Sequence, residues 1–467
     1  MANVVLCYYT EVAQVFYESL QKELVECGNN VIRLNLGGCI NNGRVLNAEL
    51  NEILEYSPDL IISFNNALSL IAGSEAVNGP VLVYAADTPE LFFNKEEMLA
   101  QDERYFYVST QPCGKRLFED VIGRTLVEGS SHFYIPAATS LHAESLDVDK
   151  NLSFIASNHC QKDFIENELF YEQIGCDVYS LVKGNYFISL EELRSQIEYE
   201  VSDENLNALL GYAKGYYAGI VRMDALNALS DLGLAIYGVR WRGRSTYFNP
   251  DVSRCYRGKP ISTEEDNAWV YNTSKIAVNI SHPQAITTFS WRVMDIMASN
   301  ACLLMEKKDD WLDLFGSYLS DEVKSAIIYD DQYDMRQKAK ALLSNEELRL
   351  RCVRECQHAI AQNGRWPHRF NELGVFFNLS LCNEGRGEGK YVQFIGEEKK
   401  LVEDMVRGIE DCNRLNFLSS LRLRMRLKCA SYSFLMMMAQ IPVLDSLLQA
   451  KKWRGRMVGK MLKYAKE

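Results

Sequence analysis

Short apolar runs alternate with amphipathic stretches of helical length along the first 140 residues. Val4–Tyr9 is almost wholly apolar, and Asn30–Leu36 places apolar residues at alternate positions. Apolar runs of this length, separated by helices, are typical of parallel strands that are buried on both faces of a sheet. The pattern therefore predicts a Rossmann-like domain over residues 1–145. Its further strands are expected at Asp59–Phe64, Pro80–Ala85, Tyr105–Ser109 and Ser131–Ile135.

The same alternation starts again at residue 146 and continues to residue 382. Leu152–Ala156 predicts the first strand of this half, and Asp334–Gln362 predicts one or two helices. Two Rossmann-like halves in one chain place a ligand cleft between them, at the carboxyl ends of their strands. The predicted fold class is α/β, with two Rossmann-like domains, a cleft between them and a C-terminal helical extension. The other strands of the second half are expected at Leu234–Tyr237, Ile276–Ile280, Ala301–Met305 and Ser325–Tyr329.

Residues 383–467 differ in composition from the rest of the chain. The glycine-rich stretch 383–390 predicts a linker, and helical patterns follow it. The whole chain has a net charge of −12, but residues 417–467 alone carry +9 and the remainder carries −21. The acidic body argues against nucleic acid as a partner. The basic helices suit peripheral contact with an anionic membrane, although a helical hairpin that packs on the acidic body or on a second subunit, as in a homo-oligomer, has the same pattern.

The cysteines and the first residues bear on the compartment. The chain has 13 cysteines and no C-x-x-C pair, and several, such as Cys7 and Cys302, lie within apolar runs. This usage is typical of reduced thiols in a cytosolic protein. The N-terminus has no basic region of a signal peptide, and no run reaches the roughly 20 apolar residues that span a bilayer. We expect a cytoplasmic protein, with peripheral contact at the inner face of the membrane left open.

The stretch 271–304 carries the most informative polar residues. A predicted strand ends in a polar loop, and a helix then begins with Thr288 or Ser290 as its cap. The start of such a helix suits a diphosphate. Arg292 and Asp295 are three residues apart and share a face of this helix. The arginine suits an anionic ligand and the carboxylate suits sugar hydroxyls, although an intrahelical ion pair on a solvated face would have the same spacing.

This stretch resembles the C-terminal domain of the CgeB-like (spore maturation protein type) glycosyltransferases, which have the two-Rossmann GT-B fold. The resemblance begins with Ser274-Lys275-Ile276 and Asn279-Ile280, and continues through Arg292 and Asp295 to Leu303-Leu304. It extends over about residues 1–375. Further segments that resemble the family, in the family's order, are Asp87-Thr88-Pro89, Tyr134–Ala138, Leu152–Ala156, Leu234–Trp241 and Arg365–Arg369.

The resemblance implies a nucleotide-sugar donor bound mainly by the second domain, with the acceptor against the first. Asp295 would hold the donor ribose, and Arg292, Lys275 and Arg240 would neutralise the diphosphate. Side-chain cations and a helix dipole do this in the family, so no metal and no cofactor are implied. The predicted donor site comprises Gly238, Arg240, Lys275, His282, Thr287, Ser290, Arg292 and Asp295.

The chain departs from the family pattern at three positions. Thr287 stands where related retaining enzymes have the first of two glutamates, which leaves the stereochemical outcome open. Asn300 and Ala156 stand where the family has glycine. These changes either reshape the phosphate loop or mark an altered activity.

Two acidic residues are candidates for the catalytic base. Asp87 and Glu11 each follow a predicted strand of the first domain, on the side that faces the cleft. A carboxylate there could deprotonate an acceptor hydroxyl. Both residues also suit a structural role, Asp87 as a turn cap before Pro89 and Glu11 as a first-turn acid of a helix.

The predicted function is transfer of a sugar from a nucleotide-sugar to a glycan or protein acceptor, without a metal. The six histidines show no metal-ligand spacing, although His282 lies where it could touch the donor. Two alternatives remain open. One is a nucleotide-sugar isomerase of the 2-epimerase type, and the other is a non-catalytic nucleotide- or sugar-binding protein with the same fold.

Overall fold

The computed structural model describes residues 1–9, 14–36, 47–71, 73–92, 95–158, 172–239, 241, 249–259, 261, 263–382, 389 and 391–393. Met1–Ile395 forms one compact unit, which contains all of these residues. Glu11, Arg240 and the predicted C-terminal extension after residue 393 lie outside the described residues. The membrane or subunit contact of 417–467 therefore stays a prediction.

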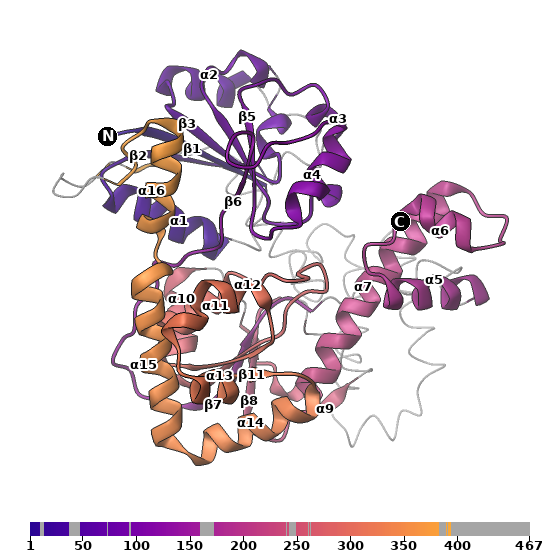
Figure 1. Ribbon diagram of the computed structural model, residues 1–467, viewed down its shortest axis with the longest axis vertical. Helices are drawn as coiled ribbons and strands as arrows, with labels where there is room; N and C mark the ends of the chain where they lie inside the picture. Colours follow the sequence, from indigo (N-terminus) through magenta and orange to yellow (C-terminus); the bar gives the residue numbers. More distant parts are fainter. Residues whose placement is uncertain are drawn as a thin grey trace, which may run out of the picture. The chain divides into compact units, whose positions relative to one another are not determined.

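The first domain is built on a parallel sheet with helices on both sides (Figure 1). The described part of the chain contributes seven strands to it. The strand order is β12-β2-β1-β3-β4-β5-β6, with β1 and β3 in the buried centre. The strands are β1 (Asn3–Tyr8), β2 (Asn30–Asn35), β3 (Leu60–Phe64), β4 (Val81–Tyr84), β5 (Tyr105–Ser109), β6 (His132–Tyr134) and β12 (Tyr391–Gln393).

Both faces of this sheet are covered, because successive side chains of a strand point to opposite faces. Val4 and Leu6 of β1 pack with α1 (Gln14–Glu26) and α16 (Trp366–Phe377). Val5 and Cys7 pack on the other face. The helices on that second face are α2 (Asn47–Tyr56), α3 (Lys95–Met98) and α4 (Gly114–Ile122).

The second domain has a parallel sheet of five described strands in the order β11-β10-β9-β7-β8. A single large apolar core joins this sheet to the surrounding helices. The strands are β7 (Lys150–Ile155), β8 (Leu234–Tyr237), β9 (Ser274–Asn279), β10 (Cys302–Glu306) and β11 (Ile328–Tyr329). The helices are α9 (Pro250–Cys255), α10 (Glu264–Asn272), α11 (Arg292–Ala298), α12 (Asp309–Phe315), α13 (Asp321–Ile327), α14 (Gln332–Ser344) and α15 (Glu346–Asn363).

Three helices between β7 and β8 form a small core of their own. They are α5 (Gln173–Gly184), α6 (Leu190–Gln196) and the first part of the long α7 (Asp203–Asn227). Val178, Leu193 and Leu206 are fully buried among them. The last turns of α7 instead join the core of the second sheet.

The α/β fold class with two Rossmann-like domains is confirmed by these two parallel sheets. One predicted strand, Ser325–Tyr329, is wrong over most of its length. The chain is helical there as α13, and only Ile328–Tyr329 forms a strand. The reason is the start of the helix, where the Ser320 hydroxyl accepts a hydrogen bond from the backbone of Val323 and two acids occupy the first turn.

The C-terminal part of this unit returns to the first domain. Trp366 and Phe370 of α16 are buried against the first sheet, and β12 pairs with β2. Asn29 donates to the carbonyl of Leu381 at 2.7 Å, which holds the chain after α16 on the same domain. The sequence pattern predicts neither this packing nor β12, and the boundary at residue 382 stays a prediction.

Candidate functional site

A cavity of about 450 Å³ is lined by residues of both domains. It lies at the carboxyl ends of β4, β5, β7 and β9, as the two-Rossmann prediction requires. The first domain contributes Tyr84–Pro89 and Ser109–Gln111. The second contributes Ala156-Ser157, Arg222 and the segment 282–292, of which all but Pro283, Ile286 and Thr287 line the cavity.

Arg222 is a cationic residue of the cavity that sequence reasoning missed. It is 2% exposed, and its guanidinium donates to the carbonyls of Ser157 at 2.6 Å and Ile280 at 3.3 Å. These carbonyls follow β7 and β9, so the arginine is fixed at the strand ends. The available signal was weak: Arg222 stands among apolar residues in the helical stretch 218–226, which also contains Asp224, and arginine is almost never fully buried unless it is paired.

Arg292 supplies a second positive charge to the cavity. Its guanidinium lies 5.5 Å from the centre of the Trp291 ring, and burial lowers its pKa. Within the described ranges, no carboxylate lies within ion-pair distance of it, and it donates no hydrogen bond to another side chain or carbonyl. A desolvated cation of this kind favours an anionic ligand. The alternative of an intrahelical pair with Asp295 is not what the structure shows.

His282 lines the same cavity in its neutral form. Burial, with the positive charges of Arg222 and Arg292, lowers its pKa to about 3. Its Nδ1 accepts a hydrogen bond from the backbone of Gln284 at 3.3 Å. The ring proton therefore belongs on Nε2, which makes this nitrogen a donor.

The predicted helix cap is wrong, although the loop that carries it does reach the cavity. The helix begins at Arg292, and Trp291 at its cap position accepts no side-chain bond. Ser290 lines the cavity and donates its hydroxyl proton to Asn279 at 2.8 Å, but it lies one residue before the cap position and its hydroxyl oxygen accepts no backbone N–H of the helix. Thr288 donates to the carbonyl of Thr110 at 2.7 Å and joins the two domains. Thr287 bonds Asp310 at 3.1 Å and does not line the cavity.

Asp295 lies behind the cavity rather than in its wall. Its carboxylate accepts from the Thr139 hydroxyl at 2.5 Å and from the Asn267 amide at 2.8 Å. Burial raises its pKa to about 7. Both oxygens are thus engaged by the protein, and Asp295 joins α11 to the segment that connects the domains. The predicted ribose contact stays a prediction.

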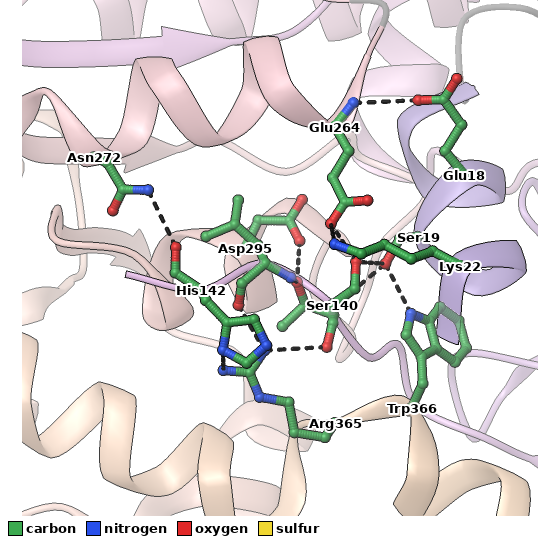
Figure 2. Close-up of polar contacts among 12 residues, drawn as sticks. Glu18, Ser19, Lys22, Ser140, His142, Glu264, Asn272, Asp295, Arg365 and Trp366 are labelled. Carbon is green, nitrogen blue, oxygen red and sulfur yellow. Dashed lines mark hydrogen bonds and ion pairs between the residues drawn. The ribbon is translucent and has the colours of Figure 1, made fainter. Parts of the chain in front are cut away.

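The two connections between the domains run next to each other beside Asp295, as Figure 2 shows. Arg365 donates to the carbonyl of Leu141 at 2.6 Å. Trp366 donates to Ser19 at 2.8 Å, and Ser19 in turn lies 2.8 Å from the Ser140 hydroxyl (Figure 2). These bonds hold both connections against α1, behind the cavity.

Asp87 is in the cavity wall, exposed to the cavity, on the first-domain side. Asn65 donates to its carboxylate at 2.9 Å and accepts from the backbone of Ala86 and Asp87. Asn65 adopts a positive φ of 49° in the turn after β3. This asparagine, which sequence reasoning did not single out, aims the carboxylate of Asp87.

Two other predicted donor residues lie elsewhere. Lys275 is the second residue of β9, at the amino end of the strand and away from the cavity. Gly238 follows β8 and has a φ of 116°. A Cβ at this position would lie 2.3 Å from the carbonyl oxygen of Ala156. Its role in the described structure is a tight backbone contact. Glu11 and Arg240 have no described position.

The described residues hold neither a cluster of metal ligands nor a membrane-spanning helix. Among them, no group of three or more His, Cys, Asp or Glu side chains is placed to hold a metal ion. No helix in this part of the chain has the length and apolar character to cross a membrane.

Residues 222–374 match a protein family described as glycosyl transferase-like. The match runs from Arg222 through His282 and Arg292. A DNA-modifying β-glucosyltransferase is 11% identical with a TM-score of 0.47, over 81% of this chain and all of its own. Sucrose-phosphate synthase of Thermosynechococcus elongatus is 9% identical with a TM-score of 0.48, over 81% and 98%. S. aureus TarM is 11% identical with a TM-score of 0.41, over 73% and 58%. Curated proteins give no match.

Proposed function

We propose that the protein transfers a sugar from a nucleotide-sugar donor to a hydroxyl of a glycan or glycoprotein, without a metal ion. The observation that carries the proposal is that Arg222 of α7 and Arg292, the first residue of α11, both line the cavity. Two cations in one cavity suit a diphosphate. The glycosyl transferase-like match over residues 222–374 supports the same assignment.

Cavity residues of the two domains would have different roles in the reaction. Breaking the bond between sugar and diphosphate leaves negative charge on the departing diphosphate, and Arg222 and Arg292 would stabilise that charge. The neutral His282 would donate from Nε2 to a phosphate or sugar oxygen. Asp87 would take the proton of the attacking acceptor hydroxyl, and Asn65 would hold its carboxylate in place.

A non-catalytic nucleotide- or sugar-binding protein is the second candidate. Thr287 favours it, because this residue stands where related retaining enzymes have the first glutamate, bonds Asp310 and does not line the cavity. Hydrolysis of the nucleotide-sugar in the absence of an acceptor separates the two, since only the transferase releases free sugar.

A thermal-shift series with nucleoside diphosphates and nucleotide-sugars tests the proposal. A ligand that binds the folded state stabilises it by RT ln(1 + [L]/Kd). We expect one nucleotide to stabilise the protein, and Arg292→Gln to weaken its binding about 10- to 100-fold, the worth of one or two charge-assisted hydrogen bonds.

Arg336→Gln is the matched control. Arg336 pairs with Asp231 on the surface, outside the cavity. Its loss should leave nucleotide affinity unchanged. Equal nucleotide affinities in wild type and Arg292→Gln, or no stabilisation by any nucleotide, would refute the donor site.

A further inference from the structure

Gln111 closes one side of the cavity, in the loop between β5 and α4. Its side chain is 7% exposed and lines the cavity with Asp87. The amide nitrogen donates to the backbone carbonyl of Gln284, across the cleft, at 3.4 Å. A carbonyl only accepts, so the amide nitrogen must face Gln284 and the amide oxygen must point elsewhere.

That amide oxygen is buried and has no hydrogen-bond partner among the residues that the structure describes. A buried acceptor without a donor has lost its hydrogen bond to water and gained none in return. The bond to Gln284 is longer than the usual range of about 2.7–3.2 Å, so little is lost when the side chain turns toward a ligand. The oxygen is therefore set to accept from a bound O–H or N–H group.

A chain of hydrogen bonds fixes the loop around Gln111. Ser109 Oγ donates to the backbone carbonyl of Gln111 at 2.8 Å and lies 2.9 Å from His132 Nε2. His132 Nδ1 lies 2.6 Å from the Glu128 carboxylate. Gly114 packs on the same serine, since a Cβ there would lie 2.2 Å from the Ser109 Cβ. The backbone that carries Gln111 is therefore fixed, so its side chain can reach only a limited part of the cavity when it turns toward a ligand.

The two walls of the cavity differ in the groups that they present. The second domain has the cations Arg222 and Arg292 in its wall, whereas the first has the carboxylate of Asp87 and the Gln111 side chain, whose buried oxygen becomes an acceptor when the side chain turns. Acceptor oxygens favour hydroxyl groups and disfavour anions. We infer that Gln111 is a specificity-determining residue that accepts a hydrogen bond from a hydroxyl of an uncharged sugar acceptor. This inference rests on the proposed function and names the acceptor class.

Binding of simple sugars to the full chain tests the inference. The probes are methyl glycosides of common hexoses and N-acetylhexosamines, each beside its 6-phosphate, measured by NMR with and without the nucleotide that stabilises the protein best. We expect at least one neutral glycoside to bind more tightly than its phosphate. Gln111→Leu should weaken its binding about tenfold or more, as expected for a lost hydrogen bond in a buried site.

Nucleotide affinity reports separately on the fold and on the donor site. It should stay within about twofold of wild type in Gln111→Leu, because the diphosphate contacts lie on the other wall. Gln357→Leu is the matched control, since its amide also donates to a backbone carbonyl, that of Ser299 at 2.8 Å, outside the cavity. If Gln111→Leu loses nucleotide binding as well, Gln111→Asn replaces it, because it keeps an amide but withdraws the oxygen.

The outcomes are distinct. A glycoside whose affinity falls in the Gln111 variant, with nucleotide affinity kept, supports the inference. Equal glycoside affinities, tighter binding of the phosphates, or no neutral glycoside bound by wild type would overturn it. Failure of wild type to bind any nucleotide would instead refute the proposed function, and the nucleotide-free sugar series would still decide the role of Gln111.

Discussion

Single residues of the cleft show how far local chemistry follows from sequence. Arg292 and Asp87 face the cavity as the sequence predicts. Ser290 does not cap the helix because the helix begins two residues later, at Arg292, and the Ser290 hydroxyl instead donates to Asn279, eleven residues earlier. Such a partner is set by the tertiary fold and leaves no mark in the spacing of the helix. Its neighbours in the sequence hint that Arg222 is buried, but its place in the cavity is set by the carbonyls that follow β7 and β9, which the sequence does not reveal.

Substitution of Gly238 tests whether its close backbone contact contributes to stability. An alanine there would put its Cβ 2.3 Å from the carbonyl oxygen of Ala156, at a φ of 116°. We expect Gly238→Ala to lower the free energy of unfolding by about 2–4 kcal/mol, from backbone strain and steric overlap.

The control is Gly211→Ala in the exposed part of α7, where a Cβ meets nothing within 4 Å. Alanine should stabilise this helix position by about 0.5–1 kcal/mol. Urea unfolding of both variants measures the difference. A Gly238→Ala variant as stable as wild type would mean that β7 and β8 approach less closely than described.

At the scale of elements, α16 belongs energetically to the first sheet although it follows the second domain in sequence. Phe370 is 1% exposed and packs within the core that contains Val4 and Leu6. Phe370→Ala should cost about 3–5 kcal/mol, the usual range for a buried phenylalanine. Hydrogen exchange should then increase in β1 and β3 more than in β7 and β9.

Val375 supplies the comparison, because it is on the same helix but 85% exposed. Val375→Ala should change stability by no more than about 0.5 kcal/mol. If exchange in Phe370→Ala increased equally in both sheets, the two domains would unfold as one unit and α16 would not belong to the first alone.

The elements themselves were largely predictable. Strands such as β1 and β10 are continuous apolar runs because both of their faces are buried. Such runs can be recognised from the sequence alone. The short β11 was misplaced because Ser320 and two acids start a helix over the apolar run before it. The three-residue β12 has no pattern of its own, and it is a strand only because β2 offers a free edge.

For the whole molecule, the buried carboxyl of Asp295 links stability to pH. Its pKa is raised to about 7 in the folded state, against about 3.9 in an unfolded chain. The folded state therefore holds the proton more tightly, and this residue lowers stability as pH rises from about 4 to about 7. The loss reaches at most ~4 kcal/mol, the equivalent of three pKa units.

Asp295→Asn should remove this part of the pH dependence. The Asn267 amide can turn to accept from the new amide, so the pocket keeps its hydrogen bonds. Wild type should be the more stable protein near pH 4.5 and lose that advantage by pH 7.5. Thermal unfolding at both pH values measures this, with Asp251→Asn on the surface as control. A constant difference between wild type and Asp295→Asn would show that the carboxyl is ionised throughout.

Because α16 and β12 are the last described elements of the chain, the first domain is completed only late in synthesis. When residues 1–145 have emerged from the ribosome, Trp366 and Phe370 have not yet been synthesised. One face of the first sheet, which carries Val4, Leu6, Tyr8 and Phe64, then lacks their cover. That cover emerges only after the whole second domain has been synthesised. In the nascent first domain α1 covers this face only in part, and the area that α16 covers stays exposed for more than 200 residues of elongation, which favours non-native association during that interval.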